Sequence, residues 1–249
     1  MKACIGLLVI IIIIMIINYE SALNRFMKAS DIIDIDDTLR DIKTGDIFFT
    51  RLDYKAQPNP LLYFILNVGH YNIGNGLYTH TGVFIKIDNE VYILQDTASP
   101  LFDYLTNTYA VCQICLVKAR DYFNLYKGNV YIYKSRKEVT IPNSILVNKM
   151  RHITQVYRPS RSIITWADSI LGINSSIQSN QVLCTNVSIL MLQILGLVNT
   201  EINPLKHYTM PDYTKIINSL GYQYTGLMNN IHTIHFSKAN KHVHFGASY

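Results

Sequence analysis

Charged residues are scarce in this sequence. Asp, Glu, Lys and Arg make up 16% of its 249 residues, whereas hydrophobic residues make up 49%. A disordered chain needs the opposite balance, so this composition excludes disorder over most of the length. The length suits one core of about 200 residues with shorter attachments.

Cysteine is also scarce, and four cysteines do not form a disulfide scaffold in a chain this long. Cys112 and Cys115 have the C-x-x-C spacing of redox and metal pairs, but the sequence from Ala110 to Val117 has the pattern of a strand. Residues three apart on a strand point to opposite faces. We therefore interpret both as structural thiols.

No metal or cofactor site is expected. The histidines near the C-terminus lack cysteine or carboxylate partners at metal-ligand spacing, so we interpret them as part of a solvated tail. They are His232, His235, His242 and His244. The net charge of +5 favours an anionic surface such as acidic lipid, but the basic residues are scattered, so we expect no nucleic-acid partner. The sequence leaves the oligomeric state open.

The N-terminus carries the one long apolar run. It extends from Ala3 to Ile17, with Lys2 before it and Glu20 after it. About 20 residues are expected for a membrane span and about 7–15 for the core of a secretory signal, so both interpretations stay open. Because Tyr19–Ala22 is a poor cleavage site, residues 1–18 are predicted to be an uncleaved membrane anchor. A secreted or periplasm-like protein is the alternative.

The rest of the chain divides into a polar linker or short helix at 19–43 and one folded domain at 44–249. Expected strands lie at 47–50, 81–87, 91–95, 111–119 and 130–133, and expected helices lie at 60–68, 144–156, 163–171 and 182–195. Strands that precede helices indicate an α+β fold rather than a doubly wound parallel sheet. Asp88-Asn89-Glu90 predicts a hairpin between the second and third strands.

Cys184 is the candidate nucleophile because it begins a predicted apolar helix. The unpaired N–H groups and positive dipole at a helix start stabilise a thiolate, so we expect a lowered thiol pKa. The same N–H groups can hold an oxyanion. A buried core cysteine is the alternative.

His80 and Gln95 are the candidate partners of this thiol. His80 begins a strand in Tyr78-Thr-His-Thr-Gly82, and Gln95 ends the next strand, close enough for its oxygen to accept the imidazole N–H. Gly82 leaves room for another backbone or a substrate, and with Tyr78 it is a predicted substrate contact. For each residue alone, a purely structural role is the alternative.

These segments together carry a resemblance. Gly45-Asp-Ile-Phe-Phe49, Tyr78–Gly82, Val91–Gln95 and Gln181-Val-Leu-Cys-Thr-Asn186 resemble the circularly permuted branch of the NlpC-type papain-like superfamily. Within it, the similarity is to YiiX/YebB-like bacterial proteins and their poxvirus relatives, and more distantly to lecithin:retinol acyltransferase. The resemblance implies an antiparallel sheet or small barrel packed on helices.

The resemblance further implies a Cys184–His80–Gln95 triad and acyl transfer from an amide or ester, on a lipid or peptide substrate. Two departures stand against it. YiiX-like proteins usually have glutamate where this chain has Gln95, and often Ser-Glu where it has Thr185-Asn186. The alternative function is therefore a catalytically weak or inactive membrane-bound structural or lipid-binding protein, such as one of a viral envelope.

Overall fold

The structure is a computed structural model that describes residues 2–26, 34–57, 59–74, 76–97, 100–111, 113–160, 180–206 and 208–229. Its helices are α1 Lys2–Phe26, α2 Ile35–Asp41, η2 Tyr54–Ala56 (3-10), α3 Pro60–Gly74, α4 Ala119–Leu125, α5 Asn143–Val156, α7 Cys184–Ile194 and α8 Met210–Ser219. Its strands are β1 Ile47–Leu52, β2 His80–Ile87, β3 Glu90–Thr97, β4 Leu101–Asp103, β5 Thr108–Ala110, β6 Gln113–Lys118, β7 Gly128–Lys134, β8 Arg158–Pro159, β9 Gln181–Val182 and β10 Gln223–Asn229.

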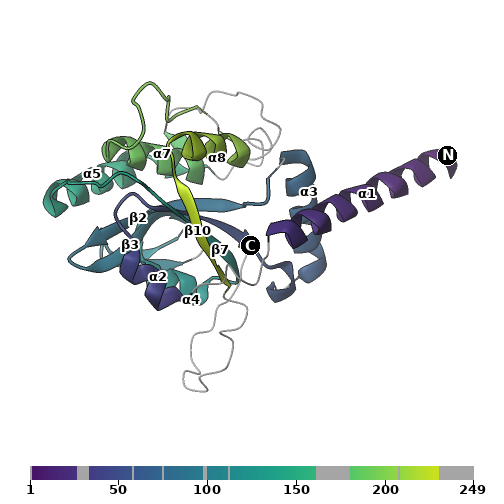
Figure 1. The fold of residues 1–249 in the computed structure, drawn as a ribbon, viewed down its shortest axis with the longest axis horizontal. Helices are drawn as coiled ribbons and strands as arrows, with labels where there is room; N and C mark the ends of the chain where they lie inside the picture. Colours follow the sequence, from purple (N-terminus) through teal and green to yellow (C-terminus); the bar gives the residue numbers. More distant parts are fainter. Residues whose placement is uncertain are drawn as a thin grey trace, which may run out of the picture.

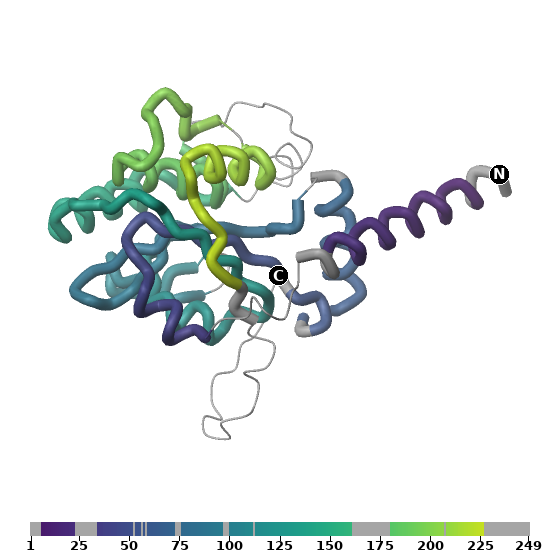
Figure 2. Tube along the Cα trace, viewed as in Figure 1, coloured from purple at the N-terminus to yellow at the C-terminus, as the bar shows by residue number. Residues whose placement is uncertain are grey.

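A six-stranded antiparallel sheet forms the centre of the domain (Figure 1), in the order β10-β7-β1-β2-β3-β6. Helices α5, α7 and α8 cover one face, and α2 and α4 cover the other (Figures 1 and 2). The predicted α+β class with an antiparallel sheet packed on helices is therefore confirmed. Because the strand order is linear and ends at β10 and β6, the domain has an open sheet rather than the small barrel.

The predicted hairpin joins β2 to β3 by the shortest type of turn. Ile87 pairs with Glu90, and the two residues between them, Asp88 and Asn89, have φ values of 48° and 68°. Two positive φ values in a two-residue loop match the twist of antiparallel strands, and Asn and Asp tolerate them. This turn sets the register that carries Gln95 back along His80's strand.

The C-terminal part of the described chain completes the core. Tyr213 on α8 is fully buried, and β10 pairs with β7 at the sheet edge. The predicted helix at 163–171, Cys112 and the four C-terminal histidines lie outside the described residues.

The segments before residue 44 contact the domain. Leu39 of α2 is buried beside α4, and Tyr19 and Ala22 of α1 are buried against α3. In the described part of the chain, no helix combines the length and the apolarity that a membrane crossing needs. The boundaries at 18/19 and 43/44 stay predictions, and limited proteolysis tests them.

Candidate active site

His80 and Gln95 form a direct side-chain pair across the β2–β3 hairpin. The distance from His80 Nε2 to Gln95 Oε1 is 2.8 Å. An amide oxygen only accepts hydrogen bonds, so in this arrangement Nε2 carries the proton and donates it. In the neutral ring, Nδ1 is then left with a lone pair, which is the state that a general base requires.

Gln95 is buried within the sheet. Its side chain is 1% exposed, and it lies opposite Cys115 in the β3–β6 ladder. Burial raises the pKa of the Cys115 thiol, which fits a structural role for this cysteine. The Gln95 amide Nε2 is buried without a hydrogen-bond partner among the described residues. One end of the amide is thus committed to His80 and the other end is unsatisfied.

Cys184 is the first residue of α7, as predicted, and Asn186 fixes that helix start. Asn186 Oδ1 accepts from the backbone N–H of Leu183 at 3.1 Å, while its Nδ2 donates to the carbonyls of Pro204 and Lys206 at 2.6 and 2.7 Å. A glutamate carboxylate cannot donate to those two carbonyls. The departure from Ser-Glu is therefore matched by a local network specific to the amide.

The thiol of Cys184 lies at the backbone N–H of Thr81, the residue next to His80. The β2–β3 ladder runs from Ile87 paired with Glu90 to Val83 paired with Leu94. Thr81 lies beyond that last pair, and its N–H faces the thiol. The helix start thus reaches the sheet beside the residue proposed as its base.

The expected lowering of the Cys184 pKa is wrong for the unliganded protein. Burial raises the pKa of the thiol to about 12, and the Asp96 carboxylate adds to the effect. Three backbone N–H groups lower the pKa of the thiol, but by less than burial raises it. They belong to Thr81, Thr185 and Cys184. At neutral pH the resting thiol is therefore protonated, and an attack needs a base rather than a preformed ion pair.

The two predicted substrate contacts are placed inside the domain. Tyr78 is buried, its ring stacks on Phe49 at 4.5 Å between centroids, and its hydroxyl bonds that of Tyr133 at 2.9 Å. A Cβ on Gly82 would lie 2.8 Å from the Phe48 ring and 3.0 Å from the Leu94 carbonyl oxygen. Internal packing thus accounts for a glycine at position 82, and the ring of Tyr78 is part of the hydrophobic core.

Tyr122 of α4 is a residue near the site that the sequence did not indicate. Its ring contacts Phe48, whose ring also contacts His80. Burial raises the pKa of its hydroxyl well above the usual value, and the charges of Tyr126 and Cys184 contribute to that shift. Because α4 has seven residues and no side-chain cap, its sequence carried no helix signal.

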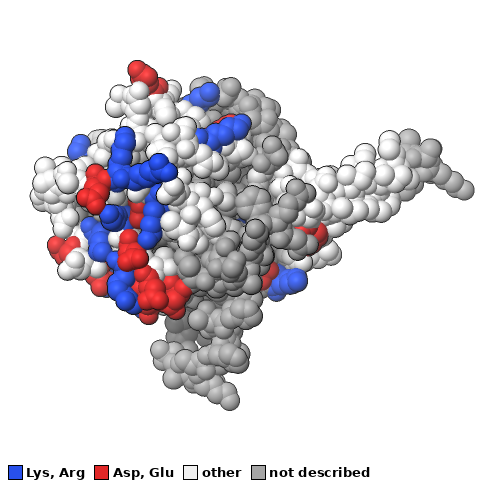
Figure 3. Space-filling model, viewed as in Figure 1, with Lys and Arg blue, Asp and Glu red and all other residues white. Residues whose placement is uncertain are grey.

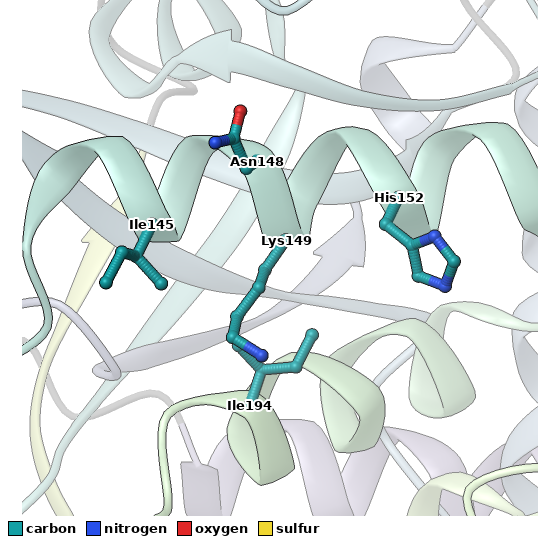
Figure 4. Close-up of a pocket in the computed structure, with 5 residues that line it drawn as sticks. All are labelled: Ile145, Asn148, Lys149, His152 and Ile194. Atoms are coloured by element: carbon teal, nitrogen blue, oxygen red, sulfur yellow. The ribbon is translucent and has the colours of Figure 1, made fainter.

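Two surface cavities lie away from these residues. One of about 450 Å³ is lined by both signs of charge, including Arg40, Lys134 and Asp46. The other, of about 550 Å³, lies between α5 and the end of α7 (Figure 4), where Lys149 extends towards Ile194. Ile194 is about 15 Å along the helix from Cys184.

No group of three or more metal-ligating side chains occurs among the described residues.

Comparisons with known proteins add little. No family model matches the chain, and no curated protein matches it. Among solved structures, the chain is similar to the crystal structure of metalloprotein yiiX from Escherichia coli O157:H7, at 11% sequence identity and a TM-score of 0.41. The similarity covers 73% of this chain and 95% of that chain. At that level the likeness settles neither family nor activity.

Proposed function

We propose that the protein is a thiol hydrolase or acyltransferase of the permuted papain-like type, with Cys184 as nucleophile, His80 as base and Gln95 as the residue that orients the base. The observation that carries the proposal is the 2.8 Å contact from His80 Nε2 to Gln95 Oε1, at the sheet position that the start of α7 reaches. The order of the segments along the chain supports it as well.

The chemistry follows from the protonation states. His80 Nδ1 takes the thiol proton as Cys184 Sγ forms a bond to the carbonyl carbon of the substrate. The backbone N–H groups at the start of α7 hold the oxyanion of the tetrahedral intermediate in this proposal. When the bond to the leaving group breaks, the imidazolium of His80 returns the proton to it, and a thioester remains on Cys184. Water or another acceptor then releases the acyl group.

The substrate is proposed to be an acyl ester or amide of a lipid or a peptide, and the protein is proposed to act at a membrane to which residues 1–18 hold it. No resident metal or cofactor enters these steps. The inactive structural or lipid-binding protein remains the second candidate, because Gln95 replaces the glutamate of YiiX-like proteins.

A panel of chromogenic acyl esters and acyl amides, with chains from acetyl to palmitoyl, tests the proposal. We expect the full chain in detergent to hydrolyse at least one member, and Cys184→Ala to lose that activity to background. Cys115→Ala is the matched control and should retain it. Turnover that survives in Cys184→Ala would contradict Cys184 as the nucleophile. No turnover of any member would favour the second candidate.

A further inference from the structure

Helices α1 and α3 are joined into one unit. The buried residues of their contact are Tyr19 and Ala22 of α1, Val68 of α3 and Leu77 just beyond it. The Asn72 side-chain amide of α3 also donates to the backbone carbonyl of Met15 at 2.9 Å. The position of α3 is therefore fixed relative to α1, so a surface that binds α1 also lies near α3.

Beyond this contact, α1 projects away from the domain (Figures 1 and 2) and is apolar on every side. The consecutive residues Leu7 to Ile14 are 45–61% exposed, and together they cover more than two turns of helix. A protein partner covers a stripe of a helix, whereas a helix that is hydrophobic all round belongs in a core or in lipid. Because apolar side chains surround this part of α1, its surface is suited to the hydrocarbon interior of a bilayer.

Helix α3 presents a second apolar surface beside the base of α1. Its exposed large side chains have the spacing of one helix face and are 43–69% exposed. They are Leu61, Leu62, Ile65 and Leu66. None of the 15 residues of α3 is Asp, Glu, Lys or Arg.

The largest group of charged side chains lies away from α1. In the view of Figure 3, acidic and basic side chains cluster over the side opposite α1, around α2; a smaller group lies at the base of α1, and the part of the helix that projects shows none. The cavity lined by Arg40, Lys43, Lys86 and Lys134 belongs to that charged side. The projecting part of α1 and the exposed face of α3 are thus apolar, whereas the main charged area lies on the far side of the domain.

On the basis of the proposed membrane attachment of residues 1–18, we propose that the exposed face of α3 lies against the same lipid bilayer, as a second membrane contact. A bilayer is the occupant because one continuous surface must cover both the full circumference of α1 and the adjoining stripe of α3. This contact goes beyond the anchor at residues 1–18. It holds the domain against the membrane by the segment that leads into β2, whose first residue is His80.

Depth-dependent fluorescence quenching tests this contact. Trp166 is the single tryptophan of the chain, so Trp166→Phe removes the background. Into this full-length chain, single tryptophans are introduced as Ile65→Trp on α3, Ile10→Trp on α1 or Ile145→Trp on α5. Each variant is reconstituted with phosphatidylcholine vesicles, either plain or brominated in the acyl chain. Ile145 is 47% exposed and serves as the matched control, because α5 lies at the end of the domain opposite α1 (Figure 1).

Bromine should reduce the emission of Ile65→Trp and Ile10→Trp at least twofold and leave Ile145→Trp unchanged. Leu62→Trp, on the same face of α3, should repeat the result and replaces Ile65→Trp if that variant does not fold. Quenching at position 10 but not at 65 or 62 would overturn the proposal. So would a blue shift at position 65 without bromine quenching, because it would indicate a protein partner, and so would the absence of quenching at position 10.

Discussion

Replacing His80 with alanine is expected to slow acylation of Cys184 at pH 7 by about 100-fold or more, the usual range for loss of a general base. The reason is that the thiol of Cys184 is protonated in the resting protein and must lose its proton before it attacks. With a pKa of about 12, Cys184 has almost no thiolate at neutral pH, so its reactivity depends on proton transfer to the imidazole. The rate of modification by a thiol-directed acyl probe measures this effect.

The pH dependence separates loss of the base from general damage. Without His80, the thiolate must form by ionisation alone, so the rate of His80→Ala should rise about tenfold per pH unit below the thiol pKa. The wild-type rate should level off once His80 is neutral. His152→Ala is the matched control, because His152 is an exposed histidine on α5. A His80→Ala variant with more than half the wild-type rate would remove His80 from the mechanism.

Substitution of Gln95 is expected to give two distinct outcomes. Gln95→Ala removes the acceptor at 2.8 Å that orients the ring, so we expect a fall of about tenfold or more in acylation rate with the base still present. Gln95→Glu puts a carboxylate in place of the amide. Its charge stabilises imidazolium and raises the pKa of His80, so the acid limb of the pH–rate profile should move to higher pH.

A structural role for Gln95 predicts something different. In that case both variants would lower thermal stability and leave the shape of the pH–rate profile unchanged. The unsatisfied Nε2 also means that a carboxylate loses no hydrogen bond at that atom, although it adds a charge at a site that is 1% exposed. A profile for Gln95→Glu that overlays the wild type would contradict the orienting function.

Local signals in the sequence were sufficient for the hairpin and the helix start. Asp88 and Asn89 specify a two-residue turn, and that turn alone brings Gln95 back along the strand of His80. The break from polar residues to the apolar run at Cys184 located the start of α7. These features depend on neighbours in the chain, so the sequence displays them.

Features that depend on tertiary packing were missed or misjudged. The backbone N–H groups at the start of α7 lower the pKa of Cys184, as predicted, but burial raises it by more. Burial depends on segments far away in the chain, so the local sequence does not reveal it. Tyr122 approaches the site only through packing on Phe48. The start of helix α8 has a recognisable sequence pattern, although the helix was not predicted. Thr209 is the N-cap and accepts a hydrogen bond from the backbone N–H of Asp212, and Pro211 lies in the first turn.

The most direct test of the triad is the site of covalent acylation during turnover. The protein is mixed with an ester that it hydrolyses, quenched in acid within the first turnover, digested and analysed by mass spectrometry. We expect one acyl group per chain on the peptide that contains Cys184, released by neutral hydroxylamine as a thioester is, and absent from His80→Ala at the same time point. An acyl group on any other residue, or turnover without an acylated Cys184, would contradict the account.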